Sequence, residues 1–263
     1  MFSNDSMAPA STVPFILITC EHGGNRIPSR YAEFFHDQDA LMLSHRAYDP
    51  GALRLAQDMA ETLSAPLVVS TISRLLIDLN RSPSHPKLYS EATRMLSPTI
   101  RQEILQRYYL PYRTKIETRI AQAITAGARV IHVSCHSFTP EFDGKLREGD
   151  IGLLYDPKRM AEAALCRHWQ AALKLQAPAL KTRMNYPYKG ISDGLATYLR
   201  RRFDDDSYVG IELEINQRHV RAGGAHWHAV RAAVVSTVRQ VVEVTYGLNT
   251  VGLDTVAPKN LHE

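Results

Sequence analysis

The sequence lacks the features of a secreted or membrane-spanning protein. Its three cysteines, Cys20, Cys135 and Cys166, form neither a CxxC pair nor an even set, which argues against a disulfide framework. Residues 1–13 have no basic segment followed by an apolar one, so they do not resemble a signal peptide. No apolar run approaches the roughly 20 residues that a membrane-spanning helix needs. These absences predict a soluble cytoplasmic protein with reduced thiols and no membrane partner.

A concentrated basic surface is also missing. Lysine and arginine number 31 against 27 acidic residues, for a formal net charge of +4. The basic residues are scattered, and the run LRRRFDDD at 199–206 sets three arginines beside three aspartates. Nucleic-acid binding requires a basic face with aromatic residues for stacking. The sequence therefore predicts no nucleic-acid partner, and it leaves the oligomeric state open.

The hydrophobic pattern alternates along the chain between buried-strand runs and helical periods. Strand-like runs lie at residues 14–19, 66–72, 128–135, 150–156 and 208–215, and helical patterns lie at 51–63, 90–126, 159–174 and 225–245. Such alternation is typical of a mostly parallel sheet covered by helices. We expect a single α/β domain of three layers over residues 14–247, with a mixed, mostly parallel sheet and helices on both faces. Residues 1–13 and 248–263 are expected to be flexible tails.

Acidic and histidine side chains follow several of the predicted strands. Glu21 and His22 come directly after the first run, His136 follows the third, and Asp49 precedes the first long helix. In open α/β sheets, ligands bind at the carboxyl ends of the strands. Two histidines and a carboxylate match a catalytic zinc site that leaves one position open for water. Two alternatives remain, because His136 could be a hydrogen-bonded core histidine and Asp49 an ordinary helix N-cap.

Other polar residues extend this pattern. Two glycines follow His22, where they would let the backbone pass close to a ligand. Glu214 near the end of the last predicted strand could accept a proton from water. Arg81 in DLNRSP could fork onto a substrate carboxylate, although a surface salt bridge with Asp78 would also explain it.

Five segments in a fixed order are similar to the N-formylglutamate amidohydrolase family. They are CEHGGNRIP, ISRLLIDLNRSP, HVSCHSFTP, NYPYKG and IELEINQRHV. The order also resembles the wider group of zinc-dependent amidases and exopeptidases, which implies a zinc-exopeptidase-like fold. This resemblance implies His22, Asp49 and His136 as metal ligands and Glu214 as the catalytic base. Peptidoglycan amidases of this group have glutamate where this chain has Asp49, so Glu21 remains a rival ligand.

The resemblance implies hydrolysis of the amide bond of an N-formyl or short N-acyl amino acid such as N-formylglutamate. One divalent metal ion, expected to be zinc, would activate the water, and Arg74 would stabilise the developing oxyanion. An acidic N-acyl amino acid is the expected partner, with a substrate-binding set of five residues: Arg81, Asn80, Asn185, Tyr188 and Ser137. A peptidoglycan-type zinc amidase and a non-catalytic binding protein for an acidic metabolite are the alternatives.

Overall fold

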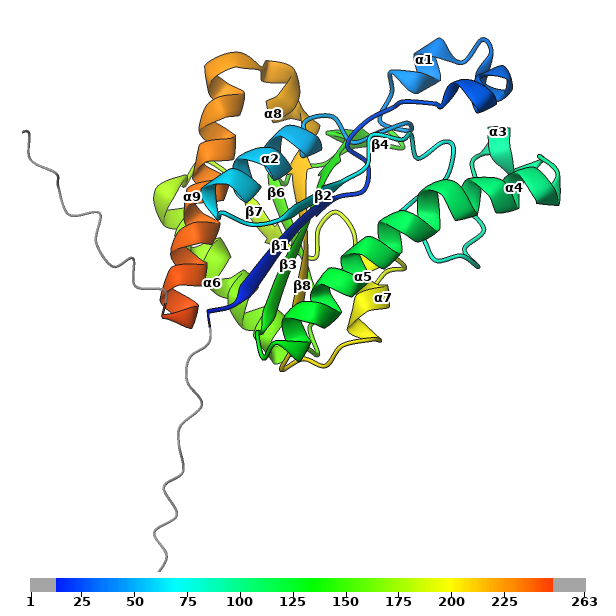
Figure 1. Cartoon of the computed structure of the whole chain (residues 1–263). Helices are drawn as coiled ribbons and strands as arrows, with labels where there is room; N and C mark the ends of the chain where they lie inside the picture. The colour runs from blue at the N-terminus through cyan, green and yellow to red at the C-terminus, as the bar shows by residue number, and fades with distance from the viewer. Residues whose placement is uncertain (1–12, 248–263) are drawn as a thin grey trace, which may run out of the picture.

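Six strands form one sheet within residues 13–247, which are the residues that the computed structural model describes (Figure 1). The strand order is β2-β1-β3-β8-β6-β7. The strands are β1 (Phe15–Cys20), β2 (Leu67–Val69), β3 (Val130–Phe138), β6 (Ile151–Leu154), β7 (Thr182–Met184) and β8 (Tyr208–Asn216). Every residue of β3 is buried, as expected for a central strand that is covered on both faces.

The strand directions place the ends of several strands at one edge of the sheet. β2, β1, β3 and β8 run parallel, whereas β6 is antiparallel to β8 and β7 is parallel to β6. The carboxyl ends of β1, β3 and β8 therefore meet the amino end of β6. The mixed, mostly parallel sheet expected from the sequence is confirmed.

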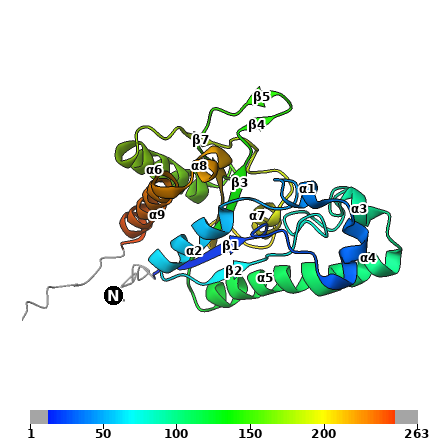
Figure 2. The ribbon, with the colours of Figure 1, turned by 90° about the horizontal axis from the view of Figure 1, so that it is seen from above.

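Helices cover both faces of the sheet, which confirms the three-layer α/β architecture (Figure 2). One hydrophobic core joins the sheet to α2 (Ala52–Thr62), α6 (Met160–Gln176) and α9 (Gly224–Tyr246). A second core on the other face includes α5 (Leu110–Thr125) and α7 (Leu195–Arg200). Apolar residues of α2 at Leu55, Ala56 and Met59 are fully buried, as the helical spacing of the sequence requires.

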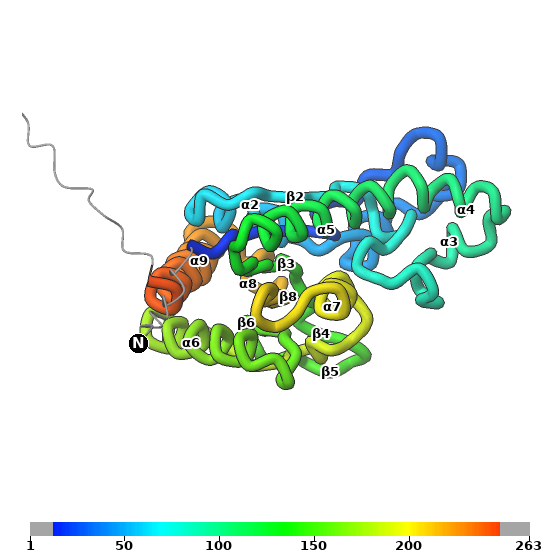
Figure 3. Tube along the Cα trace, turned by 60° about the horizontal axis from the view of Figure 1, so that its bottom comes forward, coloured from blue at the N-terminus to red at the C-terminus, as the bar shows by residue number. Residues whose placement is uncertain are grey.

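The shorter elements lie mainly around the rim of the sheet. They are a 3₁₀ helix (Ser29–Phe35), α1 (Asp39–Met42), α3 (Glu91–Arg94), α4 (Pro98–Ile104), the hairpin strands β4 (Glu141–Phe142) and β5 (Lys145–Leu146), and α8 (Gln217–Ala222). One π-helical turn at Leu105–Tyr109 joins α4 to α5. Figure 3 shows α3 and α4 on the side of the molecule away from α6 and α9.

The main differences from the expected elements concern boundaries and short segments. Most of the predicted helical region 90–126 is one continuous run from α4 into α5. β3 extends to Phe138, so His136 and Ser137 lie within the strand rather than after it. β7, α7 and the β4–β5 hairpin are too short to leave a periodic signal. The predicted tails lie outside the described residues, apart from the exposed Val13.

Two expectations about the chain as a whole can be compared with the structure. All three cysteines are buried and unpaired. Among residues 13–247, no helix combines the length and the apolar character that crossing a membrane requires.

Candidate metal centre

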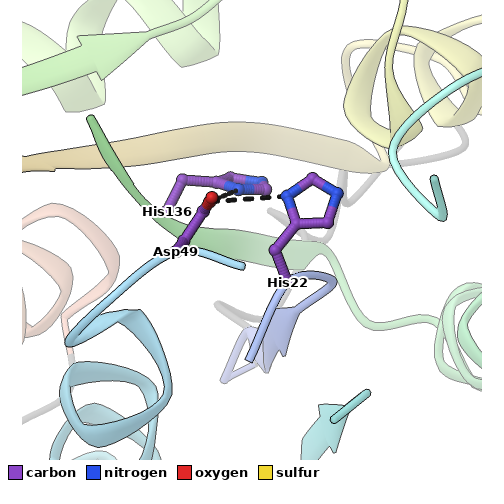
Figure 4. A group of neighbouring side chains, drawn as sticks. All are labelled: His22, Asp49 and His136. Atoms are coloured by element: carbon purple, nitrogen blue, oxygen red, sulfur yellow. Dashed lines mark hydrogen bonds and ion pairs between the residues drawn. The ribbon is translucent and has the colours of Figure 1, made fainter. Parts of the chain in front are cut away.

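Three elements bring His22, Asp49 and His136 together at the carboxyl edge of the sheet (Figure 4). His22 lies two residues beyond β1, Asp49 lies just before α2, and His136 lies on β3. The backbone N–H of Asp49 donates to the carbonyl of His22 at 2.9 Å, which fixes the two loops against each other. One ligand atom from each of the three buried side chains lies within 4.8 Å of the others.

The two imidazole rings present the same nitrogen to a shared oxygen. The Nδ1 atoms of His22 and His136 lie 3.4 and 2.9 Å from Oδ2 of Asp49. Figure 4 shows the three side chains pointing toward one another. In the metal-free protein, burial lowers the pKa of His136, but its hydrogen bonds to Asp49 and Glu21 outweigh this and hold the pKa well above its ordinary value.

The opposite nitrogen of each ring faces a second buried carboxylate. Nε2 of His22 lies 2.7 Å from Oδ1 of Asp78, and Nε2 of His136 lies 3.2 Å from Oε2 of Glu21. Metal-binding histidines usually donate their second N–H to such a group, which orients the ring and leaves the first nitrogen free for the metal. Glu21 therefore lies on the side of the His136 ring opposite to Oδ2 of Asp49. The geometry favours Asp49 over Glu21 as the third ligand.

The side chain of Asp49 does not cap α2. Gly51 is the N-cap residue of that helix, and no side chain accepts a hydrogen bond there, so the N-cap interpretation is wrong. Instead, Oδ1 of Asp49 binds Nη1 of Arg74 at 3.1 Å, and Nη2 of Arg74 binds Oδ2 of Asp78 at 3.0 Å. Arg74 thus holds two carboxylates of the site in fixed positions.

Glu214 lies beside this group on the neighbouring strand. The parallel register of β3 and β8 sets Glu214 directly opposite His136, so both side chains leave the same face of the sheet. Oε2 of Glu214 is buried and has no hydrogen-bond partner among the described residues. Burial raises the pKa of this carboxyl to about 8, although His136 partly opposes the shift.

The donor set of the three residues fits a divalent metal ion. Two imidazole nitrogens and one carboxylate oxygen are the ligands of many catalytic zinc sites. Each ring is oriented by a second acceptor, as expected around such a metal. The unpartnered oxygen of Glu214 leaves an acceptor free beside the site.

Asn80 of the DLNRSP segment lies beside His136. Nδ2 of Asn80 is 3.4 Å from Nε2 of His136, and Oδ1 of Asn80 accepts from the backbone N–H of Leu195. Arg81 donates through Nη1 to the carbonyls of Asn80 and Asp193, while its buried Nε has no partner among the described residues. The alternative salt bridge between Arg81 and Asp78 is not formed.

Two other predicted substrate-binding residues have their side chains bonded to the protein. Ser137 donates to the carbonyl of Pro50 at 2.8 Å. Oδ1 of Asn185 accepts from the backbone N–H groups of Tyr155 and Gly190. These bonds give both residues a structural role, and direct contact with substrate stays a prediction for each.

The NYPYKG segment doubles back across β6 and brings Tyr188 to the site. A Cβ at Gly152 would lie 1.7 Å from the carbonyl oxygen of Tyr186, so only glycine lets the backbones cross there. Gly152 is paired with Glu214. Tyr188 is 46 % exposed and interacts electrostatically with Glu214 and Asp49. This crossing gives the segment a physical role that its sequence does not reveal.

The two glycines after His22 lie close to the segment after β2. A Cβ at Gly23 would lie 2.9 Å from the carbonyl oxygen of Ser70, and one at Gly24 would lie 2.8 Å from that of Thr71. The glycines therefore allow close packing against the segment after β2. The approach of a ligand to this backbone stays a prediction.

Sequence reasoning missed two features around the site. The sequence offers Asp78 as one of the polar residues after the second predicted strand and as a salt-bridge partner of Arg81, but it does not predict that Asp78 binds His22 and Arg74. Arg147 was not considered, although its guanidinium is 3.4 Å from the hydroxyl of Tyr188. The preference for acidic neighbours around metal-bound histidines could have identified Asp78.

Comparisons with known proteins identify the family and the fold of the chain. The model of the N-formylglutamate amidohydrolase family matches residues 14–220. A crystal structure of a gene product from Agrobacterium tumefaciens has 28% sequence identity and a TM-score of 0.75, over 88% of this chain and 92% of that one. An N-formylglutamate amidohydrolase from Ralstonia eutropha JMP134 has 16% identity and a TM-score of 0.64, over 91% and 96%. No curated protein matches the sequence.

Proposed function

Because this chain belongs to the N-formylglutamate amidohydrolase family, we propose that it hydrolyses N-formylglutamate or a similar short N-acyl amino acid. The products would be the free carboxylic acid, which is formate for an N-formyl substrate, and the amino acid. The observation that carries the proposal is the convergence of His22, Asp49 and His136 beside the unpartnered oxygen of Glu214.

His22 and His136, through Nδ1, and Asp49, through Oδ2, would hold one divalent ion, with zinc the expected metal. Such an ion, when bound, polarises the acyl carbonyl and lowers the pKa of water. Asp78 would orient His22 by accepting from its Nε2. Glu21 and the hydroxyl of Ser134, which donates to Glu21, would do the same for Nε2 of His136 and so set the tautomer of that ring. Arg74 would keep Asp49 in place and offset part of the negative charge of Asp49 and Asp78.

Glu214 would move the proton in this reaction. Its Oε2 would accept a proton from the attacking water and pass it to the leaving nitrogen. The carboxyl must be ionised to begin, and a nearby cation would lower the raised pKa that burial produces in the metal-free protein. A carboxyl with an elevated pKa is well suited to return the proton afterwards.

Substrate contacts would come from the DLNRSP and NYPYKG segments. The unpartnered Nε of Arg81 offers a donor to a substrate carboxylate, and Asn80 and Tyr188 would add polar contacts to the substrate. The side chain of Arg74 is 24% exposed. Each of its Nη groups binds one aspartate and has a second N–H, which would stabilise the developing oxyanion.

The test is formate release from N-formyl-L-glutamate by the purified protein. The protein is first stripped with a chelator and then loaded with one equivalent of zinc, and formate is measured in both forms. We expect release only from the loaded form. If the protein cleaved the amide between the lactyl group and the peptide of a muramoyl peptide, and did not act on N-formylglutamate, the result would indicate a peptidoglycan amidase. Tight binding of N-formylglutamate without turnover would replace it with a binding protein.

A further inference from the structure

Arg147 is held at the same edge of the sheet as the candidate metal centre. It follows β5 and precedes β6, whose amino end meets the carboxyl end of β8 because the two strands are antiparallel. The side chain of Asn216, the last residue of β8, donates to the carbonyl of Arg147 at 3.1 Å. Figure 2 shows the β4–β5 hairpin projecting beyond the end of β3. The position of Arg147 is thus fixed by β8, the strand that carries Glu214.

Aromatic rings orient the guanidinium of Arg147. Its Cζ lies 4.7 Å from the ring centroid of Phe142, 5.2 Å from that of Tyr188 and 5.8 Å from that of Phe138. Nη1 donates to Oγ1 of Thr139 at 3.3 Å and to the hydroxyl of Tyr188 at 3.4 Å. Such rings hold a cation in place without neutralising its charge.

Within residues 13–247, Arg147 has no carboxylate partner. Arg74 is paired with Asp49 and Asp78, and Arg218 is paired with Asp150. No described acidic oxygen lies within 4.0 Å of the Arg147 guanidinium, and its described hydrogen bonds all use Nη1. Nε and Nη2 therefore remain available to a carboxylate, which an arginine binds best through two parallel N–H groups.

The surroundings of Arg147 connect it to the reacting groups. Tyr188 contacts Arg147 and interacts electrostatically with Glu214 and Asp49. His45 interacts in the same way with Arg147, Arg74 and Asp49. The contact with Tyr188 therefore links Arg147 to the edge of the sheet that carries the candidate metal centre.

We propose that Arg147 binds one carboxylate of the substrate through Nε and Nη2, and that it thereby selects acidic N-acyl amino acids. This inference rests on the proposed function. An N-acyl glutamate carries two carboxylates, and Arg81 offers one unpartnered N–H group to them. Arg147 supplies a second cationic group, already oriented and with no acidic side chain to displace.

The test compares three substrates: N-formyl-L-glutamate, N-formyl-L-glutamine and the α-amide of N-formyl-L-glutamate. Each amide lacks one carboxylate charge and keeps the other. For the Arg147→Ala variant we expect a rise in KM of about 10- to 100-fold for N-formyl-L-glutamate, which corresponds to the loss of a charged hydrogen-bonded pair. The kcat should change little. One of the two amides should be almost insensitive to the substitution, because it lacks the carboxylate that Arg147 binds.

Two further variants separate binding from loop structure. Arg147→Lys should recover only part of the affinity, because an ammonium cannot form the two parallel bonds. Arg183→Ala is the matched control: Arg183 also stacks on a ring of the same loop, that of Tyr186, but it is paired with Glu148. It should leave the three KM values unchanged. An equal loss on all three substrates in Arg147→Ala, or no loss on any, would overturn the assignment.

Binding to the zinc-loaded Glu214→Gln variant distinguishes a failure of this inference from a failure of the proposed function. Calorimetry measures the Kd for N-formyl-L-glutamate with and without the additional Arg147→Ala change. A wild-type protein that binds this compound without hydrolysing it, and whose binding weakens with Arg147→Ala, would keep the inference and reject the proposed function. Absence of both binding and turnover would reject both.

Discussion

Two groups of histidines with a buried aspartate lie near the carboxyl end of β8 and β3, and their geometries differ. The first is the group of His22, His136 and Asp49. The second joins His219 on α8 and His226 on α9 to Asp150. Both groups have the composition of a metal site, but within the described residues only the first brings its ligand atoms to a common point.

The difference lies in how the ring nitrogens are used. In the first group, Nδ1 of both rings points at Oδ2 of Asp49. In the second group, Nε2 of His219 points at Asp150 and its Nδ1 points at His226, 2.8 Å away, so the three side chains form a chain and do not converge. Arg218 and the backbone N–H of Lys181 also bind Asp150. Against the effect of burial, these bonds lower the pKa of Asp150 to about 2. Residue types alone therefore do not define a metal site; the direction of each nitrogen does.

The largest expected effect comes from removing one histidine of each group. His22→Ala or His136→Ala should weaken zinc binding by more than about 100-fold, beyond the usual effect of losing a group that only orients a ligand. His219→Ala should leave zinc binding unchanged. Elemental analysis after gel filtration measures the bound metal. If His219→Ala lost the metal and His22→Ala kept it, the metal site would be the second group and not the first.

The next effect concerns Glu214, which has no counterpart in the second group. Glu214→Gln should lower turnover of N-formyl-L-glutamate by about 10²- to 10⁴-fold, the usual contribution of a general base. Its zinc content should remain that of the wild type. Glu212→Gln removes a carboxyl from the same face of β8 and should cost much less. Near-normal turnover by Glu214→Gln would show that another group moves the proton.

Asp78 and Glu21, which face the Nε2 atoms of His22 and His136, allow a sharper comparison between the two groups. Asp78→Asn and Glu21→Gln should each weaken zinc binding by about 10- to 100-fold, because the histidine ring loses the acceptor that orients it. Asp150→Asn is the matched control from the second group. It should lower the melting temperature without changing zinc affinity. Competition with a chromophoric chelator gives the affinities, and equal effects in all three variants would indicate a general loss of structure.

The smallest effect is a pH dependence of stability in the metal-free protein. The pKa of Glu214 is about 8 when folded, against an ordinary value of 4.5. Its contribution to stability is complete below about pH 4.5 and is lost as the pH rises through about 8. The melting temperature of Glu214→Gln relative to the wild type should therefore increase from pH 5 to pH 9. A constant difference between the two proteins would contradict the raised pKa. Asp150 stays ionised throughout this range.

Much of the candidate site could be predicted from the sequence because parallel strands share one functional edge. His22 follows a short apolar run, and Glu214 lies near the end of a predicted strand. Asp49 precedes a helix with a clear apolar face. Those signals are local, so they are visible without the fold. The structure brings all three together with His136.

Arg147 and the NYPYKG segment could not be placed in the same way. The antiparallel direction of β6 brings the residues before that strand to the functional edge, whereas in parallel strands this edge carries the residues after each strand. Tyr188 comes to Glu214 because its loop reverses over Gly152. Neither the strand direction nor the reversal leaves a periodic pattern.

The sequence by itself determined the alternation of strands and helices and the polar residues near the strand ends. The reason is that the hydrophobic period and the residues that break it are local properties. It therefore indicated which side chains near the ends of the parallel strands lie at one edge of the sheet. Only the tertiary structure decided which nitrogen of each histidine faces Asp49. The orientation of a buried ring depends on partners such as Asp78 and Glu21, and their distances and angles arise only when distant segments pack together.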